Sequence, residues 1–123
     1  MIKRDFELNK LKLYRDKPFI KIITGIRRSG KSTLLALFRQ ELLETGISPE
    51  HIITINFEDL ANEDLLDYKK LHNFVLDNLK EGKNYIFFDE IQMVQHFEKV
   101  VDSLFIRENI DLYITGSNAY FLS

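Results

Sequence analysis

Eight consecutive residues carry the clearest chemical signal in the chain. Residues 25–32 read Gly-Ile-Arg-Arg-Ser-Gly-Lys-Ser, which matches the spacing G-x4-G-K-[ST] of a phosphate-binding loop, or P-loop. The two glycines let the backbone turn tightly enough for successive N–H groups to point at phosphate oxygens. Lys31 would reach the β- and γ-phosphates of a nucleoside triphosphate, and the Ser32 hydroxyl would ligate Mg²⁺. The candidate nucleotide-binding residues are Gly25, Ile26, Arg27, Arg28, Ser29, Gly30, Lys31, Ser32 and Thr33.

A second motif ends a later apolar run. Phe87 and Phe88 are followed by Asp89 and Glu90, which is the pattern of a Walker B segment. Asp89, at the carboxyl end of a buried strand, would hold the Mg²⁺ shell, and Glu90 would orient and deprotonate the attacking water. Ligand sites in open α/β sheets lie beyond the carboxyl ends of the strands, so both motifs are expected at one edge.

The elements around these motifs alternate between strand and helix. Apolar runs predict strands over residues 19–24, 51–57, 85–89 and 112–115, and helical periodicity predicts helices over residues 7–14, 33–43, 63–79 and 94–107. Alternation of this kind predicts a mostly parallel sheet between two layers of helices, the three-layer α/β/α sandwich of P-loop NTPases. We expect one domain over residues 1–123, with an amphipathic helix and lead-in over 1–18 and the nucleotide-binding sheet over 19–123.

Composition excludes several other classes of protein. No apolar run approaches the ~20 residues that a membrane helix needs, so we expect no membrane partner. The absence of cysteine excludes disulfides and thiolate metal sites and fits a cytoplasmic protein. The three histidines fall in separate segments without metal-ligand spacing.

The charges are unevenly distributed. Residues 1–40 carry eleven Lys/Arg and three Asp/Glu, whereas residues 41–123 carry six and sixteen, so balances of +8 and −10 give the net charge of −2. Six basic residues outside the P-loop would mark either a nucleic-acid or partner surface or, as the favoured interpretation, a solvated helix face. They are Lys3, Arg4, Lys10, Lys12, Arg15 and Lys17.

The order of the motifs narrows the class of nucleotide enzyme. One strand lies between the P-loop helix and the Walker B strand, and a glutamate follows the aspartate. Together these favour ATPases with an inserted strand and a catalytic glutamate over small-molecule kinases and GTPases. The guanine-reading pattern Asn-Lys-x-Asp is absent, which favours adenine. ATP and Mg²⁺ are therefore the expected ligands.

With these residues in view, the chain resembles prokaryotic AAA-type ATPases, in the group whose ATPase core is followed by a small helical region and a C-terminal nuclease-like domain. The resemblance covers nearly the whole chain and rests on four blocks in family order: residues 23–35, 56–59, 88–92 and 114–119. The P-loop version, with two arginines before Ser29, is the most specific of the four.

The resemblance implies roles for residues outside the two motifs. Asn118 and Ser117, and after them Thr115, match the sensor-1 position that responds to the γ-phosphate; the alternative is a plain polar turn. Asn56 matches a switch residue that holds Glu90 away from water, although asparagine at a strand end is also a good turn former. The two loop arginines would contact phosphate, a partner subunit or solvent.

The resemblance also implies parts that this sequence does not show. A fifth strand beside the first, an arginine finger and a lid would be expected, and Arg107, the only arginine after Arg39, precedes the fourth strand. We therefore hypothesise an N-terminal ATPase core that belongs to a longer protein, is apparently truncated after sensor 1, and leaves the first strand at an open edge. A C-terminal domain and a homo-oligomer are the expected partners.

Two functions stay open at this point. The first is Mg²⁺-dependent ATP hydrolysis within a larger protein or oligomer, with Glu90 as the base. The second is a nucleotide-dependent switch or binding module with little hydrolysis of its own. The Asp89–Glu90 pair favours the first, and the missing finger, lid and strand favour the second. A small-molecule kinase lacks a recognisable acceptor pocket.

Overall fold

Four parallel strands form one sheet in the order β1-β4-β3-β2. The computed structural model describes residues 2–25 and 30–117, with side chains from residue 7 onward. The strands are β1 (Lys21–Thr24), β2 (Ile52–Asn56), β3 (Asn84–Asp89) and β4 (Ile110–Gly116). The predicted parallel α/β fold with four core strands is confirmed. β4 lies between β1 and β3, and β1 is an edge strand within the described sheet.

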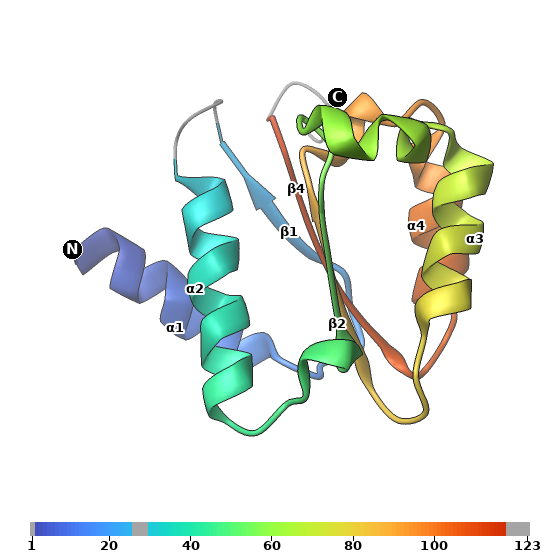
Figure 1. Ribbon diagram of the computed structural model, residues 1–123. Helices are drawn as coiled ribbons and strands as arrows, with labels where there is room; N and C mark the ends of the chain where they lie inside the picture. Colours follow the sequence, from blue (N-terminus) through green and yellow to red (C-terminus); the bar gives the residue numbers. More distant parts are fainter. Residues whose placement is uncertain (1, 26–29, 118–123) are drawn as a thin grey trace.

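Helices cover both faces of the sheet (Figure 1). On one face lie α1 (Ile2–Tyr14) and α2 (Lys31–Glu44), and on the other lie α3 (Tyr68–Asn78) and α4 (Phe97–Phe105). Short 3-10 helices occupy three connections: η1 (Pro49–His51), η2 (Leu60–Leu66) and η3 (Ile91–Met93). None of the helices in the described ranges is both long and apolar enough to cross a membrane.

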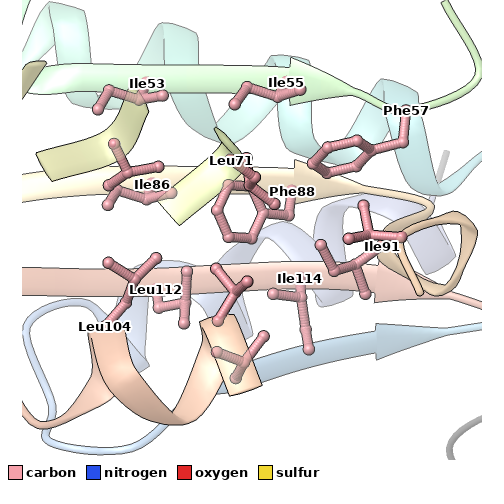
Figure 2. Close-up of a cluster of buried hydrophobic side chains, with 14 of the residues drawn as sticks. Ile53, Ile55, Phe57, Leu71, Ile86, Phe88, Ile91, Leu104, Leu112 and Ile114 are labelled. Atoms are coloured by element: carbon pink, nitrogen blue, oxygen red, sulfur yellow. The ribbon is translucent and has the colours of Figure 1, made fainter. Parts of the chain in front are cut away.

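The central strands β3 and β4 are buried along their whole length because both faces are covered. In β3, Tyr85 and Phe87 pack with α1 and α2, while Ile86 and Phe88 pack with α3 and α4, following the two-residue period of a strand. Figure 2 shows the second of these cores, where side chains from β2, β3 and β4 meet those of the helices. Two separate hydrophobic cores therefore stabilise the sheet, which leaves the carboxyl ends of its strands available for a functional site.

The helix predicted over residues 63–79 is divided in the structure. Residues 60–66 form η2, and α3 begins only at Tyr68. Asp67 lies between them in an extended conformation, and its carboxylate accepts the backbone N–H groups of Lys69 at 2.9 Å and Lys70 at 3.1 Å. An aspartate in this position caps the start of a helix. The apolar stripe in the sequence therefore runs across the boundary between two helices.

Several other boundaries differ from the predictions. α1 begins at Ile2 rather than residue 7, α2 begins at Lys31 rather than residue 33, and α4 begins at Phe97 rather than residue 94. The last of these is delayed because His96 adopts a left-handed conformation (φ 63°). In consequence η3 and the turn after it, rather than a helix, follow the Walker B motif.

Two of the basic residues near the N-terminus are engaged within the chain. Lys12 of α1 pairs with Glu41 of α2 at 3.2 Å. Arg15 pairs with Asp16 at 3.3 Å and donates to the Thr45 hydroxyl at 3.2 Å. These contacts join α1 to the end of α2, which supports the helix-face interpretation of the basic N-terminal region.

A buried polar network lies on the α1 and α2 side of the sheet, around the start of β1. Lys21, 4% exposed, pairs with Asp111, 2% exposed, and donates to the carbonyl of Lys17 at 2.7 Å. Asp111 also accepts the backbone N–H of Asp16 and the hydroxyl of Tyr113, each at 2.8 Å. Burial and the adjacent Asp111 raise the pKa of Tyr113, so its hydroxyl stays a neutral donor.

Candidate functional site

The two sequence motifs meet at the carboxyl edge of the sheet. Lys31 and Ser32 open α2, Asp89 ends β3, and Thr115 lies near the end of β4. Gly30, just before α2, has a φ of 94°, a left-handed conformation that favours glycine. Because parallel strands end at the same edge, the sheet places the two acidic residues next to the first turn of the P-loop helix.

The Lys31 ammonium lies at the centre of the site. Its Nζ atom donates to the carbonyl oxygens of Gly25 at 2.9 Å and Gly116 at 3.1 Å. It also lies 3.3 Å from Oε2 of Glu90, and the two side chains are 4% and 5% exposed. An ammonium has three N–H donors, so these three oxygens match its full capacity. Lys31 therefore connects β1, β4 and the Walker B turn.

Asp89 and Ser32 also contact each other directly. The Ser32 hydroxyl donates to Oδ2 of Asp89, and the Thr115 hydroxyl donates to Oδ1 at 2.6 Å. Both carboxylate oxygens of this buried residue are thereby satisfied by hydroxyl groups. The Thr115 oxygen in turn accepts the backbone N–H of Glu90 at 2.9 Å. Thr115 thus joins β4 to both acidic residues of the Walker B motif.

Glu90 has an unusual backbone and two side-chain partners. Its φ of 59° and ψ of 53° are left-handed, which is uncommon for a residue with a long side chain. Oε2 faces Lys31, and Oε1 accepts a hydrogen bond from Nε2 of Gln92 at 2.8 Å. Gln92 lies in the motif block of residues 88–92, where the sequence pattern predicts no role for it, and Thr115 comes after Asn118 and Ser117 among the sensor candidates.

The oxygen atoms of the site fit a magnesium ion. Ser32 and Asp89 offer a hydroxyl and a carboxylate side by side. Mg²⁺ in nucleotide sites takes one or two protein oxygens and completes its shell with phosphate and water. No cluster of three His, Cys, Asp or Glu side chains suited to a metal occurs in the described parts of the chain. Two oxygens beside a P-loop are therefore a donor set for a nucleotide-bound magnesium ion.

The remaining predicted site residues fall in different places. Asn56 is exposed at the end of β2, where its Oδ1 accepts the N–H of Glu58 at 3.0 Å, as in a turn-forming asparagine. Thr33 is exposed on the first turn of α2, and Ser117 follows β4 half-buried. The four P-loop residues Ile26, Arg27, Arg28 and Ser29, together with Asn118, lie outside the described residues.

Thr115→Val tests the bridge between β4 and the Walker B turn. Valine keeps the shape of threonine but removes the donor to the Asp89 carboxylate and leaves the buried N–H of Glu90 unpaired. We expect the free energy of unfolding to fall by about 1–3 kcal/mol, measured by urea denaturation. Thr54→Val, at an exposed position of β2, is the control and should change it by no more than about 0.5 kcal/mol. Equal values for the two variants would contradict the bridge.

Comparisons with known proteins place this chain among related sequences. A curated protein of Haemophilus influenzae described as "Uncharacterized protein" is 39% identical over 125 residues, covering 100% of this chain and 31% of the relative. "Uncharacterized protein MJ1544" of Methanocaldococcus jannaschii is 37% identical over 125 residues, covering 100% of this chain and 25% of that protein. The chain thus spans less than a third of the length of these relatives.

A solved structure and a family model complete the comparison. The structure titled "Structure of Drosophila ORC bound to DNA" aligns with a TM-score of 0.62 at 15% identity, covering 94% of this chain and 77% of the other. At that identity the alignment supports the fold alone. Residues 17–123 match the family model described as "AAA domain". The chain therefore belongs to the AAA domain family and is an ATPase-type nucleotide-binding module.

Proposed function

We propose that the chain binds ATP and, with Mg²⁺, hydrolyses it as the AAA-type core of a larger protein or oligomer. One observation carries the proposal: Lys31, Ser32, Asp89 and Glu90, from two separate motifs, meet at one edge of the sheet. A cation, two oxygen ligands and a buried carboxylate are the groups that phosphoryl transfer to water requires. Family membership supports nucleotide binding, and the geometry supports the hydrolytic step.

Each group has a definite task in this scheme. Lys31 exchanges its contact with Glu90 for the phosphate oxygens and holds the triphosphate against the first turn of α2. Ser32 and Asp89 would hold Mg²⁺, which neutralises phosphate charge when bound. Glu90 accepts the proton of the attacking water at its carboxylate. Thr115 keeps both acidic residues in place through its hydroxyl group.

The parts beyond this core are proposed to come from elsewhere. Arg107 follows α4 at the edge of the sheet opposite Glu90, and its guanidinium donates to the carbonyl of Ser103 at 2.6 Å. A stimulating arginine would therefore come from a second subunit or from a further domain. A nuclease-like C-terminal domain, nucleic acid as a partner and a cytoplasmic location are further parts of the proposal.

Calorimetric titration of Mg·ATP into the chain tests the proposal, with Lys31→Ala as the decisive variant. We expect binding by the wild type and a loss of at least about tenfold in affinity for the variant, because the ammonium is a charge-assisted donor to phosphate. Lys17→Ala, an exposed lysine away from the site, should bind like the wild type. Far-ultraviolet circular dichroism confirms that each variant is folded.

The alternative function gives a different result in the same experiment. A nucleotide-dependent binding module would bind Mg·ATP through Lys31 but show no hydrolysis when protein is in excess over ATP. The chain's single described arginine beyond α2, remote from Glu90, favours this alternative for the isolated chain. A folded wild-type chain that does not bind Mg·ATP would contradict both functions.

A further inference from the structure

The Glu90 carboxylate is held at both of its oxygen atoms. Oε2 lies 3.3 Å from the Lys31 ammonium, and Oε1 accepts the Gln92 amide N–H at 2.8 Å. The direction of the second bond is unambiguous, because an ionised carboxylate can only accept and the amide nitrogen can only donate. Glu90 is therefore held by Lys31, which binds phosphate in the proposed scheme, and by Gln92, which has no role in that scheme.

Gln92 stands on a firmly anchored turn. It lies within η3, between Glu90 and Val94, and the side chains of Ile91 and Val94 on either side are completely buried. Backbone bonds from Met93 to the Glu90 carbonyl at 3.2 Å and from Val94 to the Ile91 carbonyl at 3.0 Å close the turn. The amide group of Gln92 is thus presented to Glu90 by a turn that is held by its own backbone hydrogen bonds and by two buried side chains.

One atom of Gln92 remains without a partner. Its Oε1 is buried and has no hydrogen bond within the described part of the chain. A buried acceptor without a donor costs stability, so its presence beside a candidate catalytic carboxylate suggests that another molecule supplies the donor. A water molecule next to Glu90 has the right chemistry, because it can donate both to this oxygen and to the carboxylate.

We propose that Gln92 is the positioning residue for Glu90 in ATP hydrolysis. When Lys31 moves to phosphate, Gln92 still holds Oε1, so Glu90 keeps its place and Oε2 becomes the oxygen that receives the proton. The free Oε1 atom of Gln92 accepts a hydrogen bond from the other hydrogen atom of the same water molecule. This inference rests on the proposed hydrolytic function and assigns the two Glu90 oxygens different tasks.

Single-turnover hydrolysis by the complete 123-residue chain tests the kinetic side of the inference. Gln92→Leu keeps the size of the side chain without its donor, and Gln92→Glu replaces the donor with a second negative charge. We expect the hydrolysis rate to fall about 10- to 100-fold for Gln92→Leu and further for Gln92→Glu. The affinity for Mg·ATP and for metal-free ATP, measured by calorimetry, should stay within about twofold for Gln92→Leu.

Gln95→Leu provides the matched control. Gln95 is exposed, lies three residues further along and should give wild-type rate and affinity. An unchanged rate for Gln92→Leu would overturn the inference. Rate and affinity that fall by the same factor would overturn it as well, because that pattern indicates a merely structural role in the site.

Crystal structures of the wild type and Gln92→Leu, each with Mg²⁺ and a non-hydrolysable ATP analogue, give a readout that does not depend on activity, because the proposed scheme then places Lys31 on phosphate instead of on Glu90. We expect the Glu90 carboxylate to leave its wild-type position in the variant, while the backbone of residues 89–94 is unchanged. A carboxylate that stays in place would refute the positioning role. If the wild type binds Mg·ATP without hydrolysing it, the hydrolytic function fails, and the position of Glu90 in these two structures still decides whether Gln92 holds it.

Discussion

Replacing Glu90 with glutamine is expected to lower the rate of ATP hydrolysis by about 10²- to 10⁴-fold, the usual contribution of a general base. The amide has nearly the same size as the carboxylate but cannot take up the proton of the attacking water. Binding of Mg·ATP should persist and tighten, because Lys31 no longer has an anionic partner that competes with phosphate. Hydrolysis and affinity are therefore expected to change in opposite directions.

Single-turnover hydrolysis and calorimetry of the same preparations measure both quantities. Glu98→Gln is the matched control, since Glu98 is exposed on α4 and the substitution removes the same charge. It should leave the rate and the affinity at their wild-type values. A Glu90→Gln variant that hydrolyses ATP as fast as the wild type would remove Glu90 from the mechanism.

The largest expected loss of stability comes from Asp111→Ala. Asp111 is 2% exposed and holds three groups: the Lys21 ammonium, the Asp16 backbone N–H and the Tyr113 hydroxyl. Removing the carboxylate leaves a buried ammonium without its counter-charge, which typically costs about 3–5 kcal/mol of unfolding free energy. Urea denaturation at neutral pH measures this loss.

Two further variants separate this effect from the loss of any aspartate. Asp102→Ala, at an exposed position of α4, should change the unfolding free energy by no more than about 0.5 kcal/mol. Adding Lys21→Met to Asp111→Ala should recover part of the loss, because the uncompensated charge disappears with the lysine. If the double variant is less stable than Asp111→Ala by the full cost of a second core substitution, the pair does not act through its charges.

The sheet could be predicted from the sequence because its signals are local. β-Branched, aromatic and other apolar residues make up most of β2, β3 and β4, and the helical segments between them impose parallel strands. The break at Asp67 was missed because the apolar stripe runs on across it, although the aspartate itself is a capping residue. The strand predicted from residue 85 begins at Asn84 in the structure, where this polar side chain is fully buried and its amide bonds the backbone of Lys80.

The candidate site could also be predicted from the sequence only in part. The meeting of Lys31, Asp89 and Glu90 follows from two consecutive motifs and from the common edge of parallel strands. The hydrogen bonds of Thr115 and Gln92 depend on the left-handed backbone of Glu90 and on the register between β3 and β4, which no local pattern specifies. The Lys21–Asp111 pair joins residues 90 positions apart, so only the completed sheet reveals it.

The order of the strands also bears on how this chain is made. Within the described sheet, β1 pairs only with β4, and Lys21 lies opposite Tyr113, 92 residues later (113 minus 21). At roughly 5–20 residues per second, a ribosome needs roughly 5–18 s to travel from one to the other. During that interval the strand that leads into the P-loop has no neighbour, and the Lys31 contact at Gly116 does not exist. The nascent protein therefore completes its phosphate site only when almost all of this sequence has been translated, and until then β1 is open to chaperones and to mispairing.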